Sequence, residues 1–144
     1  MGRFLNVGII QMPVNEDTVV NLKYIEQKTN ELMSAYHKPE LIVGVECMES
    51  FTAQYIPGPM TEFFSNIAKK HGIYFIPGSM YEKHNDLPKG KFYNSAPIFN
   101  PKGELVDVWL HGDLQRILQN PVKDMLYLIS QKKIQRLEFK FVMI

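Results

Sequence analysis

The stretch Leu41–Glu46 constrains the fold of this chain more than any other part of its sequence. It reads Leu-Ile-Val-Gly-Val-Glu, so four of its first five residues are large and apolar and the run ends on a carboxylate. A short apolar run rich in β-branched residues is typical of a strand that is buried on both faces of a covered α/β sheet. The next residues, 47–51, break the pattern, so we expect the strand to open into a loop at Glu46.

Glu46 is therefore the first candidate for a functional residue. Loops at the ends of buried strands are where α/β sheets place much of their chemistry. Partial removal from water at such a position can make a carboxyl group a usable proton acceptor or donor. A simpler interpretation is that Glu46 caps the next turn or pairs with a nearby lysine, since ion pairs also place carboxylates at strand ends. The strand alone leaves both interpretations open.

Length, charge and cysteine content set limits on the class of protein. A chain of 144 residues is long enough for one domain and short for two. A net charge of +1 gives no sign of a nucleic-acid partner or an acidic membrane surface. The single cysteine, Cys47, excludes an intrachain disulfide framework and favours a reducing compartment. No apolar run has the length of a signal peptide or a membrane span, so we expect a cytoplasmic protein.

Strand-like and helix-like segments alternate along the first 110 residues. Besides the strand at Leu41, the pattern predicts strands at 4–12, 73–76, 92–99 and 105–109 and helices from a cap at 15–18 to about residue 36 and from 59 to 71. The turn at 100–103 joins the last two strands into a hairpin, and Pro97 implies a bulge or an edge in the first of them. This order predicts a layered α/β sheet with helices packed on it.

Each predicted helix carries an apolar stripe, which is most simply the face laid on the sheet. The stripes are Val19, Leu22, Ile25, Leu32, Met33 and Tyr36 in the first helix, with Thr29 filling one gap, and Met60, Phe63, Phe64, Ile67 and Ala68 in the second. His71 and Gly72 end the second helix, which favours a structural role for this histidine. His84 lies in a polar loop, 83–91, and we expect it to be solvated.

Several segments, taken together in their order and spacing, resemble the N-terminal part of the nitrilase superfamily, the carbon–nitrogen hydrolases, on the amidase side. They are VGIIQM at 7–12, LIVGVE at 41–46, IPGPMTE at 56–62 leading into AKKHG at 68–72, YNSA at 93–96 and NPKGELV at 100–106. The family shows Pro-Glu at the end of the second of these strands, and Val45 stands here in place of the proline. The resemblance covers residues 1–109, while 110–144 form a divergent tail.

The resemblance implies the N-terminal half of a four-layer αββα sandwich and a homo-oligomer that forms through a helical face. It also implies a Glu–Lys–Cys mechanism without cofactor or metal. The glutamate acts as general base, the lysine stabilises the oxyanion, and the cysteine forms a thioester with a small amide substrate as ammonia or an amine leaves. Glu46 matches the position of the family's base.

The other two catalytic residues of the family do not map onto this chain. Where the family has its lysine, the sequence reads Trp109-Leu-His-Gly-Asp113, and the next lysine is Lys123. Cys47 directly follows Glu46, and successive residues at a strand end point to opposite sides, so it is badly placed as the nucleophile. We therefore hypothesise that the chain is a truncated or frame-disrupted amidase-like protein, inactive alone, marginally soluble and able to bind hydrophobic dyes.

The tail nevertheless carries patterns of its own. The sequence predicts a short helix around 114–118, a second helix from a cap at Asn120 and Pro121 to Ile129, and a strand in which Leu137, Phe139 and Phe141 alternate with charged residues. We therefore expect the tail to be rich in helix.

Two other functions and a metal site have to be weighed against hydrolysis. One is a non-catalytic interaction module that pairs through its open sheet or helical face. A nucleotide-binding domain is weakly supported, because no glycine-rich phosphate loop follows a strand. A metal site built from Glu46, Cys47, Glu49 and a histidine is also weakly supported, because no pair of these residues has the usual ligand spacing.

Overall fold

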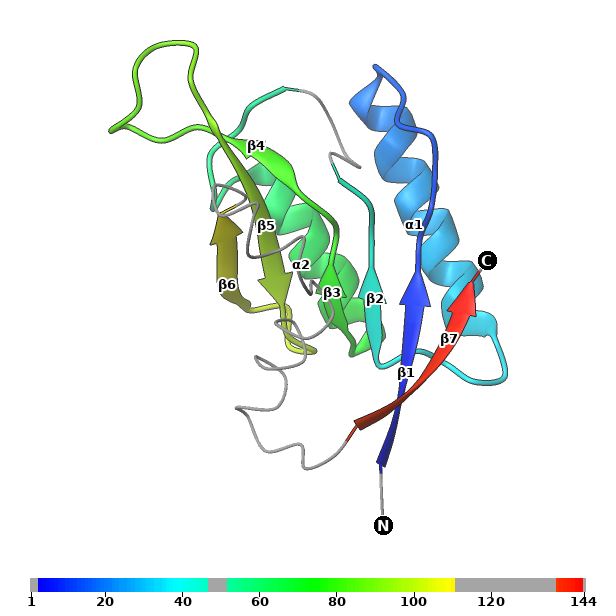
Figure 1. Ribbon diagram of the computed structural model, residues 1–144. Helices are drawn as coiled ribbons and strands as arrows, with labels where there is room; N and C mark the ends of the chain where they lie inside the picture. The colour runs from blue at the N-terminus through cyan, green and yellow to red at the C-terminus, as the bar shows by residue number, and fades with distance from the viewer. Residues whose placement is uncertain (1–2, 47–51, 111–136, 144) are drawn as a thin grey trace.

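The computed structural model describes residues 3–46, 52–110 and 137–143, and the side chains within 5–46 and 52–110. In these ranges the chain forms one mixed sheet and two α-helices (Figure 1). In chain order the elements are β1 (Arg3–Ile9), α1 (Thr18–Ser34), β2 (Leu41–Val43), α2 (Pro59–His71), β3 (Tyr74–Ile76), β4 (Met80–Glu82), β5 (Tyr93–Phe99), β6 (Leu105–Leu110) and β7 (Leu137–Met143).

The sheet combines a parallel part with an antiparallel part. Its order is β4-β5-β3-β2-β1-β7, and β6 also pairs with β5. Strands β1, β2, β3 and β7 are parallel to their neighbours within that group, whereas β5 runs antiparallel to β3, β4 and β6. The carboxyl ends of the parallel strands therefore lie at the same edge of the sheet as the start of β5. This is the upper edge in Figure 1.

Both helices lie on one face of the sheet, so the described residues form two layers (Figure 1). Alternation along the strands divides their side chains between the two faces. The helix-covered face contributes Ile42, Phe75 and Phe99 to a core that also contains Ile25 and Leu32 of α1 and Phe64 and Ile67 of α2. The opposite face carries Leu5, Val7, Leu41 and Ile76, with Ile9, Val43, Tyr74 and Ile98 packed against them. The layered α/β prediction is confirmed.

Helix α1 buries the middle of the expected stripe, but the two ends of that stripe, Val19 and Tyr36, are exposed and Asn21 is buried instead. Its buried residues are Asn21, Ile25, Thr29 and Leu32. Val19 is 56% exposed and Tyr36, which lies beyond the helix, is 96% exposed. Asn21 is buried because its side chain accepts a hydrogen bond from Asn15 N (2.8 Å) and donates one to Asn15 O (2.7 Å), which closes the preceding loop. The polar residue Asn21 therefore lies in the buried stripe at the end of the helix where the apolar pattern placed Val19.

Helix α2 follows the prediction closely. Pro59 stands at its start, and Gly58 N donates to Thr61 Oγ1 (2.7 Å), which satisfies a backbone donor ahead of the first turn. Gly72 ends the helix in the left-handed conformation, with φ 64°. The buried residues of the apolar stripe are Met60, Phe64, Ile67 and Ala68.

Several strands begin or end at other residues than the sequence predicted, and one strand was not predicted. β1 ends at Ile9 rather than Met12, and β2 ends at Val43, so Glu46 lies in a turn three residues later. Strand β4 was not predicted, because Met80–Glu82 has no apolar run and is held as a strand by pairing with β5 and by a bridge to Gln54. The hairpin of β5 and β6 is confirmed, and its pairing shifts register between Ile98 and Phe99, one residue after Pro97.

The predicted strand of the tail is confirmed as β7. All seven of its residues pair in parallel register with β1, from Arg3↔Leu137 to Ile9↔Met143. The described part of the tail is therefore a strand of the main sheet. The two helices predicted at 114–118 and 121–129 lie outside the described residues, and the division at residue 109 stays a prediction.

Candidate functional site

Glu46 lies at the edge of the sheet where the parallel strands end (Figure 1). Its side chain is exposed and follows β2 by three residues. Because β5 runs in the opposite direction, its first residues, Tyr93 and Asn94, start at this same edge. The antiparallel topology thus brings the start of β5 to the end of β2.

The backbone that leads to Glu46 is fixed by its neighbours on both sides. Ile10 N donates to Val43 O (2.9 Å), and Gly44 N donates to Ile76 O (2.8 Å). Gly78, with φ 101°, allows a very close approach, because a Cβ at this position would lie 1.7 Å from the carbonyl oxygen of Val45. Only glycine leaves room for that carbonyl. The turn after β3 therefore determines where the chain emerges before Glu46.

The Asn94 side chain joins Glu46 to β5. Its Nδ2 donates to Glu46 Oε1 at 2.8 Å. Asn94 is paired with Tyr81, and the next pair is Ser95 with Met80, a residue of the helix-facing core. Because side chains alternate between faces, Asn94 lies on the face away from the helices. The contact with Glu46 is therefore made on the uncovered side of this two-layer unit.

The helix-facing side of the same two strands holds a buried carboxylate. Ser95 Oγ donates to Glu82 Oε2 at 2.6 Å, and the two residues are 0% and 7% exposed. A buried carboxylate requires such a donor. The pair ties β4 to β5 directly behind Asn94.

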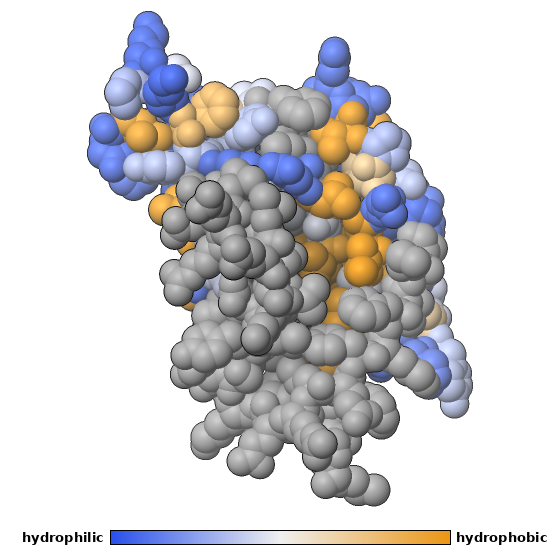
Figure 2. Space-filling model, viewed as in Figure 1, coloured by the Kyte–Doolittle hydropathy of each residue, from blue (hydrophilic) through white to orange (hydrophobic). Residues whose placement is uncertain are grey.

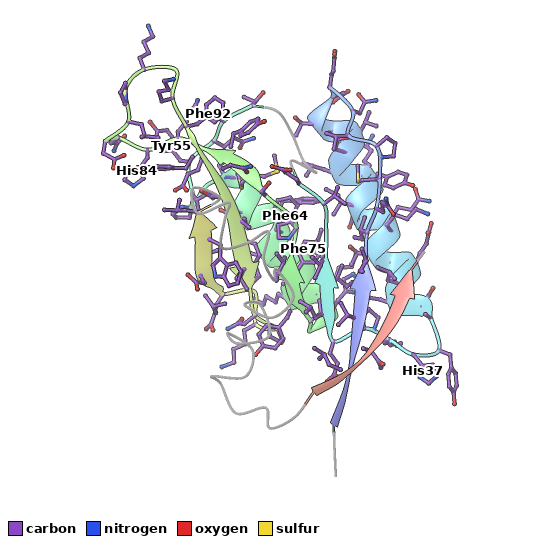
Figure 3. The ribbon with its side chains drawn as sticks, in the orientation of Figure 1. His37, Tyr55, Phe64, Phe75, His84 and Phe92 are labelled. Carbon is purple, nitrogen blue, oxygen red and sulfur yellow. The ribbon has the colours of Figure 1, made fainter. Side chains whose placement is uncertain are left out.

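A polar and aromatic cluster surrounds the loop between β4 and β5. His84 Nδ1 lies 2.5 Å from Asp86 Oδ1, Tyr93 OH donates to Asp86 Oδ2 at 3.5 Å, and the rings of Tyr81 and Phe92 are 4.5 Å apart. Desolvation and the neighbouring Asp86 raise the pKa of Tyr93. Figure 3 shows Tyr55, His84 and Phe92 gathered at this end of the molecule. The His84 side chain is 52% exposed, which confirms that it is solvated.

These features agree with the match to a known family. The sequence profile described as Carbon-nitrogen hydrolase matches residues 6–129, well over half of the chain. The chain belongs to the carbon–nitrogen hydrolase family. The match continues past residue 109, where the sequence pattern had suggested a boundary.

Individual relatives of this carbon–nitrogen hydrolase chain include curated omega-amidases. Omega-amidase NIT2 of Danio rerio is 32% identical over an alignment of 114 positions. The match covers 74% of this chain and 39% of that protein. Omega-amidase NIT2-B of Xenopus laevis is 46% identical over 54 residues, which are 38% of this chain and 18% of that protein. The chain thus matches well under half of the length of these relatives.

Solved structures of the nitrilase superfamily share the fold. Saccharomyces cerevisiae Nit3 has a TM-score of 0.59 at 25% identity, over 67% of this chain and 40% of its own. The carbon–nitrogen hydrolase of Helicobacter pylori G27 has a TM-score of 0.59 at 22% identity, over 72% of this chain and 38% of its own. An N-terminal amidase variant, C187S, has a TM-score of 0.58 at 20% identity, over 71% of this chain and 26% of its own.

The structure separates the remaining candidate residues of this carbon–nitrogen hydrolase chain. His71 ends α2, next to the start of β3, and therefore lies at the opposite edge of the sheet from Glu46. Desolvation, followed by Lys70, lowers the pKa of His71. Cys47, Glu49 and Lys123 lie outside the described residues.

The described part of the chain contains neither a group of residues suited to bind a metal ion nor a membrane-spanning helix. Within 3–46, 52–110 and 137–143, no group of three or more His, Cys, Asp or Glu residues is arranged to hold a metal ion. Within the same ranges, no helix has the length and apolar character needed to cross a membrane.

Sequence reasoning missed two residues that set the position of Glu46. Asn94 stands in the YNSA segment, but its partner is 48 residues away in sequence, and the contact exists only because β5 is antiparallel. The turn at Pro77 and Gly78 was visible as the end of a strand, but the approach of Val45 to it was not. A polar residue near the start of a strand and a glycine after a proline were the available signals.

Proposed function

We propose that this chain carries the general-base part of a carbon–nitrogen hydrolase site for a small amide, with Glu46 as the base. The observation that supports it best is the Glu46 carboxylate, exposed at the carboxyl edge of the sheet and hydrogen-bonded to Asn94 at 2.8 Å. The resemblance of the sequence to carbon–nitrogen hydrolases implies that Glu46 takes the place of the family's base, and omega-amidases are among the relatives. A base there would accept the proton of a nucleophile as it attacks the amide carbon, and ammonia or an amine would leave.

We also infer that this chain by itself turns substrate over slowly or not at all. The segment after β6 carries no lysine before Lys123, and Cys47 is the single cysteine. Loss of a nucleophile usually removes most of an enzyme's rate. Cys47 directly follows the proposed base, so the chain offers no thiol at a distance in sequence comparable with that of the family.

The test is ammonia release from a panel of short aliphatic amides by the wild-type chain, Glu46→Gln and Glu16→Gln. Glu16 is an exposed glutamate ahead of α1 and serves as the matched control. Measurable release should fall about 10²–10⁴-fold in Glu46→Gln, the usual contribution of a general base, and stay unchanged in Glu16→Gln. A rate that survives Glu46→Gln would remove Glu46 from the mechanism.

A second candidate function, a non-catalytic interaction module, has one observation in its favour. The sheet face away from the helices carries four apolar residues that are only half-buried, Ile9, Val43, Tyr74 and Ile98, packed against the buried Leu5, Val7, Leu41 and Ile76, and Figure 2 shows hydrophobic residues gathered on this side. Partly exposed apolar side chains that gather on one face favour association or dye binding. No ammonia release from any variant, together with concentration-dependent association in sedimentation, would favour this function. A monomer with a sharp, cooperative melt would count against it.

A further inference from the structure

We propose that Asn94 is the positioning residue of this site and holds the Glu46 carboxylate in one orientation. The inference rests on the proposed function of Glu46, because a fixed carboxylate matters to the chemistry only if Glu46 is the base. It concerns a residue whose own side chain need not touch the substrate.

The contact fixes one oxygen of a side chain that has many rotamers. Glu46 is exposed and stands in a turn, where a long side chain keeps rotamer freedom unless polar contacts hold it. Asn94 Nδ2 donates to Oε1 at 2.8 Å, a normal hydrogen-bond length. With Oε1 held, rotation of the carboxylate is restricted and the place of Oε2 is determined as well. A base that presents one oxygen in one place loses less rate to misalignment than a base that samples many orientations.

The oxygen of the Asn94 side-chain amide also indicates that the contact with Glu46 determines the orientation of this group. Asn94 Oδ1 is buried and has no hydrogen-bond partner. A buried polar atom without a partner costs free energy and is uncommon in proteins. The opposite orientation of the amide would place Oδ1 against the Glu46 carboxylate, where two acceptors repel. The donor contact with Glu46 therefore determines which way this amide faces, at the expense of its oxygen.

Asn94 is itself anchored on a rigid support. It lies in β5, where its backbone pairs with Tyr81 of β4, while the adjacent Ser95 pairs with Met80 on one side and Leu110 of β6 on the other. Behind it, the buried hydrogen bond from Ser95 Oγ to Glu82 ties β4 to β5. A residue in a paired strand moves less than a residue in a turn. Asn94 is thus the fixed partner and Glu46 the positioned one.

The experiment observes Glu46 directly, in the full chain with 13C-labelled glutamate. The Cδ resonance of Glu46 is identified by its loss in Glu46→Gln, and that of Glu82 by its loss in Glu82→Gln. In Asn94→Ala the Glu46 resonance should shift and its relaxation should show greater side-chain motion. The Glu82 resonance should stay in place, because β4 and β5 are still paired. The control Asn66→Ala, an exposed position on α2, should move neither resonance.

An unchanged Glu46 resonance and unchanged side-chain motion in Asn94→Ala would overturn the inference. A shift of the Glu82 resonance in Asn94→Ala would mean that the substitution disturbs the strand. The nearly isosteric variant Asn94→Asp then tests the contact instead. This variant replaces the donor by a carboxylate, so the Glu46 resonance alone should move if the contact exists, and its constancy would overturn the inference.

Kinetics separate this inference from the proposed function. Where ammonia release is measurable, Asn94→Ala should lower kcat about 10²-fold with KM little changed, because a misplaced base affects the chemical step more than binding. Spectra that confirm the contact while Glu46→Gln leaves the rate unchanged would reject Glu46 as the base and leave the positioning contact in place. Spectra without the contact would reject the inference whatever the rates.

Discussion

The two faces of the sheet divide stability and chemistry between them. The face under α1 and α2 belongs to the larger core, in which Phe64, Phe75 and Phe99 are almost fully buried. The opposite face has a smaller apolar cluster, several of whose members are only half-buried, and at its edge it carries Asn94 and Glu46. Burial of apolar surface stabilises the chain mainly on the first face. The first face holds polar groups only where they are paired, as Ser95 and Glu82 are, whereas Glu46 at the edge of the second face is exposed.

The largest effect should come from the centre of the helix-covered face. Phe75 is 0% exposed, and its ring centroid lies 5.9 Å from that of Phe64. Figure 3 shows the two labelled side chains next to each other. Phe75→Ala should lower the free energy of unfolding by about 3–5 kcal/mol, because it removes buried apolar surface and leaves a cavity. Urea denaturation followed by circular dichroism measures this. A loss below about 1 kcal/mol would mean that this face is not the main core.

An intermediate effect is expected at the edge that both faces share. Gly78→Ala combines an unfavourable positive φ with a clash against the Val45 carbonyl, whereas Gly90→Ala has a similar φ (82°) and no atom within 4 Å of the added Cβ. Conformational strain should cost both variants about 1–3 kcal/mol of unfolding free energy. Gly78→Ala should lose more, and it should also shift the Cδ resonance of Glu46. Equal losses in the two variants would argue against the close approach of Val45.

The smallest effect is expected on the face away from the helices. Ile98 is half-buried there and packs against the smaller cluster. Ile98→Ala should lower the free energy of unfolding by about 1 kcal/mol, less than the 2–5 kcal/mol usual for Ile→Ala in a full core. The same denaturation experiment measures it. A loss as large as that of Phe75→Ala would show that both faces contribute equally to the core, and the division proposed above would be wrong.

Local patterns in the sequence predicted most elements of the fold. The start and end of α2 follow from Pro59 and Gly72, and the hairpin follows from the turn at 100–103, because capping and turn preferences are local interactions. The stripe of α1 was less accurate, because the burial of Asn21 depends on its hydrogen bonds to Asn15, which hydrophobic spacing does not reveal. The role of Glu46 as the base stays a prediction.

The amino-acid sequence alone predicts alternating strands and helices, a carboxylate after the most apolar strand, and segments that resemble those of carbon–nitrogen hydrolases. The folded structure was needed to place β7 beside β1, to reveal Met80–Glu82 as a strand, and to bring Asn94 to Glu46. The physical reason is that element type depends mostly on neighbouring residues, whereas contacts between distant residues depend on the direction and order in which the strands pair.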